Sequence, residues 1–238
     1  LNLTSAAVAL AAASVAAPLA VAQTAPQARS GGLEEIVITA QRREERLQEA
    51  PLSVTAVTAQ TIEARGLTDI SKLDTPSPGF TFGRSGNDAR PAMRGIRTEN
   101  VAVNADTTIG FFVDGVFQSR SQQAMLGLVD IERIEVQRGP QGTLFGRNTI
   151  GGNISVITKQ PKLGEVDYGG SLQYGSYENT RAEAFVNAPL GDIGALRITG
   201  VRAVGDGWVE NSFNKGADLF DEDLSYIRGA VRLQPTPK

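Results

Sequence analysis

The stretch RIEVQRGPQGTLFGRNTIGGNISVITK, residues 133–159, places two runs with β-strand alternation on either side of a glycine-rich loop. The loop's glycines permit tight turns and close backbone approach, and Pro140 stiffens its entry. A phosphate-binding loop would need Lys and Ser/Thr where Gly152 and Asn153 stand, and neither the dinucleotide pattern nor a nucleophile elbow occurs. The stretch therefore predicts a structural strand–loop–strand unit.

The composition excludes several classes of function. The 238 residues contain no Cys and no His, which removes thiolate nucleophiles, histidine bases and the usual zinc or haem ligand sets. A formal net charge of −3, with one Trp and four Tyr, offers neither a basic field nor stacking platforms for nucleic acid. Any enzyme of this composition would have to work with carboxylates, Lys, Ser or Tyr, and we expect no metal site, no cofactor and no nucleic-acid partner.

The first 22 residues are Ala-rich and uncharged, and they end on an A-x-A site at 20–22. These features predict a secretory signal peptide, whereas a membrane anchor is the alternative for an apolar run of about 20 residues. The chain begins with Leu and lacks the positively charged start of such a peptide. We therefore expect the signal peptide to be incomplete at its N-terminus.

Residues 23–49 have the composition of a flexible segment, with a Pro/Ser/Gly-containing leader and a charged run over 41–49. Between them lies the β-prone island EEIVITA, residues 34–40, which has no evident sheet partner nearby in the sequence. An unpaired strand of this kind either joins the edge of a domain's sheet or pairs with another protein.

Residues 50–161 have the punctuation of a compact α+β domain. Asp114-Gly115 between two apolar runs is a strong hairpin signal, and Thr58 can cap a helix that Gly66 ends. Polar loops are expected over 83–91 and 97–108. The pattern predicts strands over 52–57, 80–82, 92–96, 109–113 and 116–117, and helices over 58–66, 68–73 and 121–129.

Residues 162–238 change to β-length segments without helical inserts, over 168–174, 180–188, 195–204 and 224–233. Ala182, Ala184 and Val186 alternate with Arg181, Glu183 and Asn187, as in a sheet with one apolar face. Strands of this length with short turns are typical of an outer-membrane barrel, with a soluble meander as the alternative. About four strands cannot close a barrel, so we expect the chain to be truncated.

Several ordered motifs together resemble the plug-domain signatures of TonB-dependent outer-membrane receptors. The resemblance is close over residues 34–161 and looser over the strands that follow. The motifs are EEIVITA (34–40), PAMRGIR (91–97), GFFVDGVF (110–117) and DIERIEVQRGPQGTLFGRNTIGGNISVITKQP (130–161).

The resemblance implies a plug domain inside a transmembrane barrel of about 22 strands. It implies import of a scarce extracellular solute such as a ferric siderophore, cobalamin or a glycan, driven by TonB from the inner membrane. Such a receptor makes and breaks no covalent bond, so the resemblance implies that the protein is not an enzyme. The TonB box would be Glu34, Glu35, Ile36, Val37, Ile38, Thr39 and Ala40, whose strand would pair with TonB. Arg94, Arg138 and Arg147 would form ion pairs between plug and barrel, with solvated surface arginines as the alternative.

Candidate substrate contacts lie in the two polar loops, which would form the apex of the plug: Arg84, Asn87, Asn100 and Asn104. The implied location is the outer membrane, in contact with its lipid. A different reading remains open from the residues alone, namely an exported soluble α+β module for binding or adhesion. A nucleotide-binding enzyme built on the glycine loop is disfavoured by Gly152.

Overall fold

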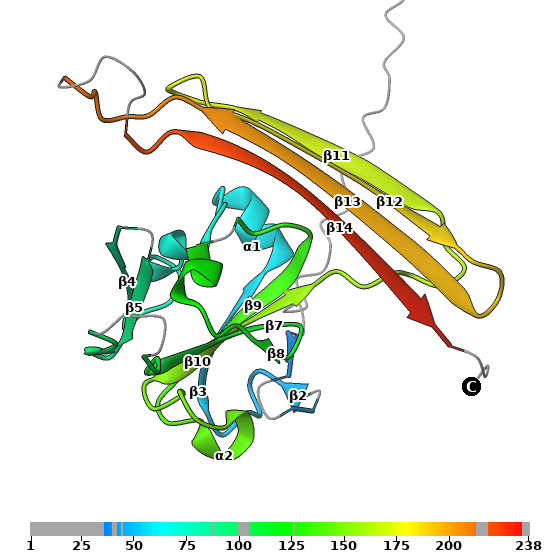
Figure 1. Cartoon of the computed structure of the whole chain (residues 1–238). Coiled ribbons are helices and arrows are strands. Elements are labelled where there is room, and N and C mark those ends of the chain that lie inside the picture. Colours follow the sequence, from blue (N-terminus) through cyan, green and yellow to red (C-terminus); the bar gives the residue numbers. More distant parts are fainter. Residues whose placement is uncertain are drawn as a thin grey trace, which may run out of the picture. The chain divides into compact units, whose positions relative to one another are not determined.

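A computed structural model of the protein describes residues 36–39, 42–43, 45–86, 88–99, 105–125, 127–212 and 219–234. Within these residues the strands pair into four sheets, of two, five, three and four strands (Figure 1). No helix in the described residues is long and apolar enough to cross a membrane.

The five-stranded sheet is built on the stretch quoted first. β9 (Ile131–Arg138) and β10 (Gly152–Thr158) flank the glycine loop and pair antiparallel, with Gly152 opposite Arg138. The strand–loop–strand prediction is confirmed, although the loop also contains the short helix α2 (Gly142–Phe145). The strand order is β3-β9-β10-β7-β8, in which β10 and β7 are parallel. The remaining strands are β3 (Ser53–Thr58), β7 (Ile109–Val113) and β8 (Val116–Phe117).

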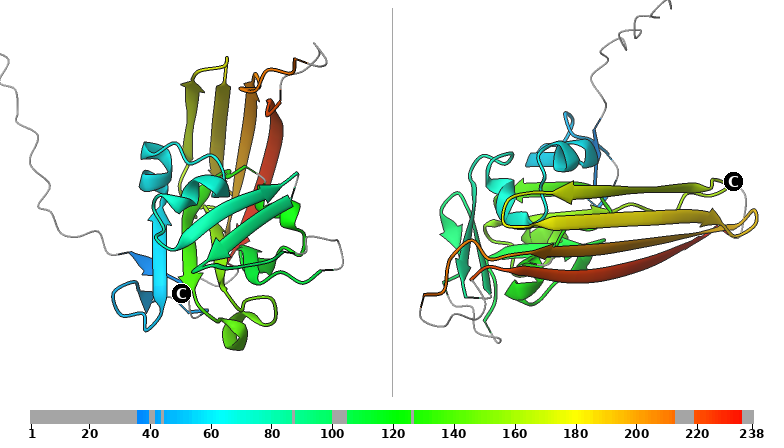
Figure 2. Two further views of the ribbon diagram at one scale, coloured as in Figure 1. Left: turned by 90° about the vertical axis from the view of Figure 1, so that its left-hand side faces the viewer. Right: turned by 90° about the horizontal axis from the view of Figure 1, so that it is seen from above.

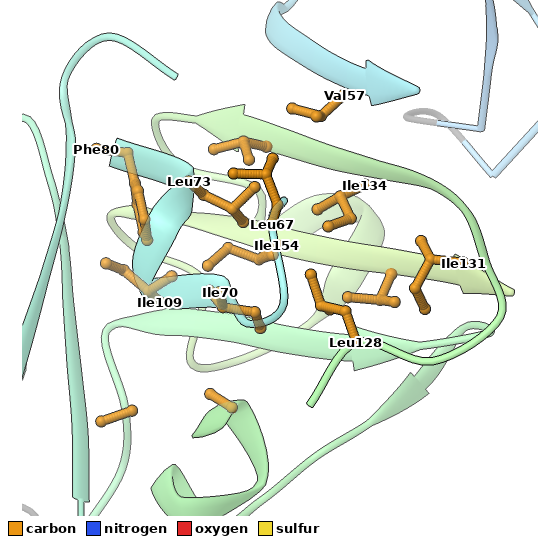
Figure 3. Close-up of a cluster of buried hydrophobic side chains, with 14 of the residues drawn as sticks. Val57, Leu67, Ile70, Leu73, Phe80, Ile109, Leu128, Ile131, Ile134 and Ile154 are labelled. Atoms are coloured by element: carbon orange, nitrogen blue, oxygen red, sulfur yellow. The ribbon is translucent and has the colours of Figure 1, made fainter. Parts of the chain in front are cut away.

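One face of this sheet carries the hydrophobic core. Ile134 and Val136 of β9 lie beside Ile154 and Val156 of β10, and all four side chains are buried. Residues from the helical turns, such as Leu73, point into the same cluster (Figure 3). Full burial of each such side chain contributes about 1.5–3 kcal/mol, so this face accounts for much of the domain's stability.

The helical turns are short and only partly as predicted. Thr58 caps the first helix as expected, accepting from the Thr61 backbone N–H at 3.4 Å. The second begins later than predicted, because Asp69 rather than Thr68 caps it. The third ends four residues early, since the chain is drawn across to bond Leu128 N–H to the Thr68 carbonyl. The three are α1 (Ala59–Ala64) and the 3-10 turns η1 (Ile70–Asp74) and η2 (Ser121–Met125).

The three-stranded sheet contains β4 (Phe80–Ser85), β5 (Asp88–Met93) and β6 (Ile96–Arg97). The polar loop expected over 83–91 is instead a continuation of two strands, so that prediction was wrong. Polar side chains are compatible with a strand when one of its faces is open to solvent. The Asp114-Gly115 hairpin between β7 and β8 is confirmed, with positive φ at both residues.

The N-terminal island also differs from expectation. β1 (Val37–Ile38) pairs antiparallel with β2 (Glu45–Arg46), which lies in the charged run expected to be a solvated tether. The strand therefore has a partner close in sequence. We call residues 36–49, as far as they are described, the N-terminal hairpin. Charged residues can form β2 because the Arg46 side chain is 62% exposed and the Glu45 carboxylate, at 9% exposed, pairs with Arg43 at 3.5 Å.

The C-terminal sheet matches the predicted strands closely (Figure 2). Its inner face carries Arg181, Glu183 and Asn187, and its outer face carries Ala182, Ala184 and Val186, as predicted. Exposed apolar side chains such as Ile198 and Ile227 continue the outer face. Its strands are β11 (Asp167–Tyr174), β12 (Thr180–Pro189), β13 (Gly194–Gly205) and β14 (Glu222–Leu233), in sequential antiparallel order.

Candidate functional site

An ion-pair cluster joins the α+β domain to the C-terminal sheet. Asp130, just before β9, is 4% exposed and accepts two hydrogen bonds from Arg197, from Nε at 2.8 Å and from Nη2 at 2.6 Å. Thr199 Oγ1 donates to the same carboxylate at 2.9 Å. Arg197 also stacks over the Phe185 ring, 4.0 Å from its centroid. A bidentate pair with a further hydroxyl donor satisfies a buried carboxylate well.

Arg228 of β14 extends this cluster across the same end of the central sheet, from the start of β9 to the end of β10. Its Nη1 lies 3.3 Å from an Asp130 carboxylate oxygen, and its Nη2 donates to Thr158 Oγ1 at the end of β10. Asp114, 3.7 Å from the same guanidinium, also binds Thr158 through both the backbone N–H and the hydroxyl. The start of β9, the end of β10 and the β7–β8 turn are thus all tied to one strand pair of the C-terminal sheet.

The charge state of Asp130 follows from these contacts. Burial by itself raises the pKa of the Asp130 carboxyl, but the hydrogen bonds from Arg197 and Thr199 and the charges of Arg197 and Arg228 outweigh it. The net effect is a pKa below the ordinary aspartate value. The cluster therefore holds a fixed negative charge between two arginines at neutral pH.

Sequence reasoning did not identify this cluster. Alternation along β13 places Arg197 and Thr199 on the inner face, which signals polar contacts on that side. Their partner could not be identified, since Asp130 lies 67 residues before Arg197 and 98 before Arg228.

A cavity of about 280 Å³ lies beside the cluster, between α1 and the inner face of β11 and β12. On the β11 side the cavity is lined by the small residues Gly170 and Ser171. Glu63, Lys159 and Glu183 add charged groups to the lining. Arg181 crosses it to donate to the Leu128 carbonyl at 2.9 Å. The contact between the two parts of the chain is thus polar and incompletely packed.

Arg138, predicted to pair with a barrel carboxylate, binds neutral acceptors of its own domain. It donates to the hydroxyls of Ser53 at 3.1 Å and Thr55 at 2.7 Å, and to the Pro78 carbonyl at 3.3 Å. Burial, and then the positive charge of Arg94, lower the pKa of the Arg138 guanidinium. In the described part of the chain no carboxylate lies within ion-pair distance of Arg138 or Arg94.

The other predicted site residues are spread over the surface. Arg94 donates to Ser53 Oγ at 3.2 Å, and Arg147 is 84% exposed and 4.0 Å from Asp106. Arg84 is exposed near the end of β4. Among the arginines and asparagines predicted as site residues, the described contacts bring only Arg94 and Arg138 together, since both donate to Ser53 Oγ. Four sets lie outside the described residues: Glu34 with Glu35, Ala40, Asn87, and Asn100 with Asn104.

A small cavity of about 50 Å³ lies between β5, the segment 105–111 and η2. Asp88 closes the hairpin side of this region by accepting from Ser121 Oγ and Gln122 Nε2, each at 2.6 Å. Gln118 and Arg120 add further polar groups to the lining. The sequence analysis placed Asp88 in an expected polar loop but did not single out any of these residues, because neither that loop nor the segment after the β7–β8 hairpin carries a binding motif.

The N-terminal hairpin is held on the polar face of the central sheet. Ile38 is fully buried, and the Thr39 backbone N–H and hydroxyl both donate to Glu135 Oε1, at 2.8 and 3.1 Å. Arg42 stacks over Phe145 of the glycine loop, 5.4 Å from the ring centroid. The segment predicted to recruit a partner therefore contacts the same β9 that begins at the Asp130 cluster.

Comparisons with known proteins agree with this architecture. The family model described as "TonB-dependent Receptor Plug Domain" matches residues 46–153. The pesticin receptor of Yersinia pestis is 33% identical over 224 residues, covering 91% of this chain and 32% of that receptor. The ferric enterobactin receptor of Pseudomonas aeruginosa is 28% identical, covering 76% of this chain and 26% of its own length. The chain thus spans about a third or less of these curated relatives.

Solved structures give the same result. The ferric yersiniabactin uptake receptor of Yersinia pestis superposes with a TM-score of 0.68 at 30% identity, covering 77% of this chain and 29% of that chain. The ferripyoverdine receptor of the outer membrane of Pseudomonas aeruginosa has the same fold, with a TM-score of 0.69 at 22% identity over 85% of this chain and 26% of that chain. The chain therefore belongs to the TonB-dependent receptors of the outer membrane and contains their plug domain and the barrel strands that follow it.

Proposed function

We propose that the chain is the plug and early barrel of a receptor that imports a ferric siderophore across the outer membrane with energy transmitted by TonB. The observation that carries the proposal is the similarity to the ferric yersiniabactin uptake receptor of Yersinia pestis, which is 30% identical and covers 77% of this chain. Receptors named for ferric enterobactin and ferripyoverdine are also among the relatives. We propose residues 1–22 as signal peptide, 23–49 as periplasmic segment, 50–161 as plug and 162–238 as barrel strands.

A second substrate class has some support, because a vitamin B12 transporter of Vibrio vulnificus is 32% identical over 70% of this chain. The apex of the plug would contact either substrate, and we propose Arg84, Asn87, Asn100 and Asn104 as contacts there. The exposure of Arg84 and the polar lining around Asp88 support this placement. Binding of a ferric siderophore and of cobalamin to the whole receptor, titrated side by side, distinguishes the two classes.

We propose residues 34–40 as the TonB box. The register of the N-terminal hairpin supports this assignment, since Leu47 N–H bonds to the Ile36 carbonyl and Val37 faces Arg46. In an antiparallel ladder such bonds alternate, so the Val37 backbone groups point away from β2. Val37 therefore lies on the free edge of β1, where another strand can add.

Replacing Val37 by Pro in the full-length receptor is expected to abolish energised uptake and to leave substrate binding at the cell surface unchanged. Proline removes an N–H from the free edge without removing a bond to β2. Uptake and binding of radiolabelled ferric siderophore by whole cells measure the two effects. Val37→Ala, which keeps the N–H at this 42% exposed position, is the matched control and should transport normally. Loss of binding together with uptake in the proline variant would contradict the proposal.

We also propose that Arg94, Arg138 and Arg147 form ion pairs with carboxylates of the receptor's remaining barrel. For Arg94 and Arg138 the support is that both guanidiniums donate to the same neutral acceptor, Ser53 Oγ, and that Arg138 is partly buried. A desolvated cation pair of this kind is stabilised by an opposing carboxylate. Arg147 is the weakest member, because it is exposed and already near Asp106.

Charge reversal of Arg138 to Glu is therefore expected to weaken plug retention and reduce uptake at least tenfold, because it places a carboxylate opposite carboxylates. Retention is measured as protease resistance of the plug in the assembled full-length receptor, alongside uptake. Arg65→Glu, at an exposed position on the plug surface, is the control and should change neither. Unchanged uptake and retention in the Arg138 variant would remove Arg138 from the proposed set.

A further inference from the structure

The Glu135 carboxylate accepts a hydrogen bond from a backbone N–H that an added strand would need to bond. Because the Val37 groups point away from β2, the alternation of the ladder places the Thr39 N–H on the same free edge. That N–H donates to Glu135 Oε1 at 2.8 Å, and the Thr39 hydroxyl donates to the same oxygen at 3.1 Å. The carboxylate thus bonds to the edge of β1 as the carbonyl of a neighbouring strand would.

Glu135 is itself rigidly positioned. It is fully buried on β9, and Arg133 Nε donates to its Oε1 at 3.0 Å. Arg133 also reaches the Thr39 hydroxyl with Nη2 at 3.4 Å, which closes a ring of three residues. Hydrogen bonds to an ionised acceptor are about twice as strong as neutral ones, so this single contact can hold a short edge strand.

The polar face of the central sheet that carries Glu135 is incompletely hydrogen-bonded in the described part of the chain. Glu135 Oε2 and both side-chain amide atoms of Gln137 and Asn153 are buried on this face without a protein hydrogen-bond partner. Each such atom has lost its contact with water and gains no protein hydrogen bond in return, which is unfavourable. Lifting the hairpin from Glu135 would let water reach the unpartnered Oε2 of that carboxylate, which lowers the net cost of release.

We propose that Glu135 is an internal competitor for the partner strand. It holds the Thr39 N–H in the resting receptor, and the incoming strand must replace its carboxylate with a backbone carbonyl. The availability of the segment is then set by one charge-assisted contact from β9, the strand that also begins at the Asp130 cluster. The inference rests on the proposed function only in naming TonB as the partner, because the hold on Thr39 is a property of the receptor alone.

Two variants of the full-length receptor test this from opposite sides. Glu135→Gln keeps the shape and an acceptor oxygen but removes the charge, and Thr39→Val removes the hydroxyl contact while leaving Glu135 and Arg133 paired. We expect both to accelerate amide hydrogen exchange of residues 37–39 about fivefold or more, and to tighten binding of the periplasmic domain of TonB by a similar factor. The effect of the double variant should be smaller than the sum of the two single effects, because both variants weaken contacts to the same oxygen, Glu135 Oε1.

Glu132→Gln is the matched control, since Glu132 lies on the same strand and pairs with Arg133 but has no contact with Thr39. Exchange of the Ile134 and Val136 amides reports whether Glu135→Gln has disturbed the core. If it has, the test of the proposal rests on Thr39→Val alone. Unchanged exchange at residues 37–39 in the deciding variants overturns the proposal. Faster exchange with no change in TonB binding would show that Glu135 holds Thr39 but does not compete with TonB. The competitor role would then be overturned, and TonB would bind elsewhere.

Discussion

Replacing Asp130 by Asn is expected to destabilise the attachment of the plug to the barrel by about 3 kcal/mol or more, the largest effect of any single charge removal in the described contacts. The substitution leaves Arg197 buried without a countercharge, whereas Arg228 keeps Asp114 at 3.7 Å, and a buried charge that loses its partner is costly. Asparagine tolerates the left-handed backbone of this residue, whose φ is +54°, so the change is electrostatic rather than conformational.

The measurement is hydrogen exchange of β9 and β10 amides in the full-length receptor, as a function of denaturant. Asp223→Asn is the matched control, because Asp223 also pairs with an arginine, Arg202, but both side chains are about half exposed or more, at 69% and 49%. Exposed pairs contribute about 0–1 kcal/mol, so the control should change little. Equal effects from the two variants would show that the Asp130 cluster is no anchor.

The pH dependence of the Asp130 effect has a definite sign. A carboxyl whose folded pKa is lowered contributes stability that is fully present above its unfolded pKa, about 3.9, and is lost as pH falls through the folded value. The difference between the wild-type receptor and Asp130→Asn should therefore be constant from pH 5 to pH 8 and shrink only in strong acid. A difference that fades near neutral pH would contradict a lowered pKa.

Local patterns predicted the parts of the fold whose causes are local. The four strands from residue 167 to 233 follow an alternation of period two, and the Asp114-Gly115 turn needs only two residues with positive φ. The glycine loop was identified as structural because the residues that bind phosphate are missing from it. These features need no knowledge of which segments meet in space.

Features that depend on distant contacts were missed. β2 consists of Glu45 and Arg46, whose composition indicates solvated chain, and it forms because Ile38 and Thr39 are fixed on the central sheet. Tertiary burial thus overrides local propensity there. The roles of Asp130 and Glu135 were missed for the same reason, since their partners lie 67 and 96 residues away in the sequence.

Replacing Gly152 by Ala is expected to destabilise the plug by about 3 kcal/mol or more, through overpacking and backbone strain together. Gly152 opens β10 with a φ of +144°, a conformation that other residues rarely adopt. A Cβ there would overlap the Gln137 carbonyl oxygen and lie 2.5 Å from Met93 Sδ. The first of these atoms is backbone of the neighbouring strand, so the clash cannot be relieved by a rotamer change.

The control for this prediction lies in the same loop. Gly142→Ala places its Cβ in open space at the start of α2, and the change should stay within about 0.5 kcal/mol of the wild type. Hydrogen exchange of the Ile154 and Val156 amides in the full-length receptor measures both variants. If Gly152→Ala were as stable as Gly142→Ala, the close approach of β10 to β9 would not require glycine. The expected contrast instead shows that Gly152 is needed for the register of the central sheet, and with it for the pairing of Asn153 with Gln137 on the polar face that carries Glu135.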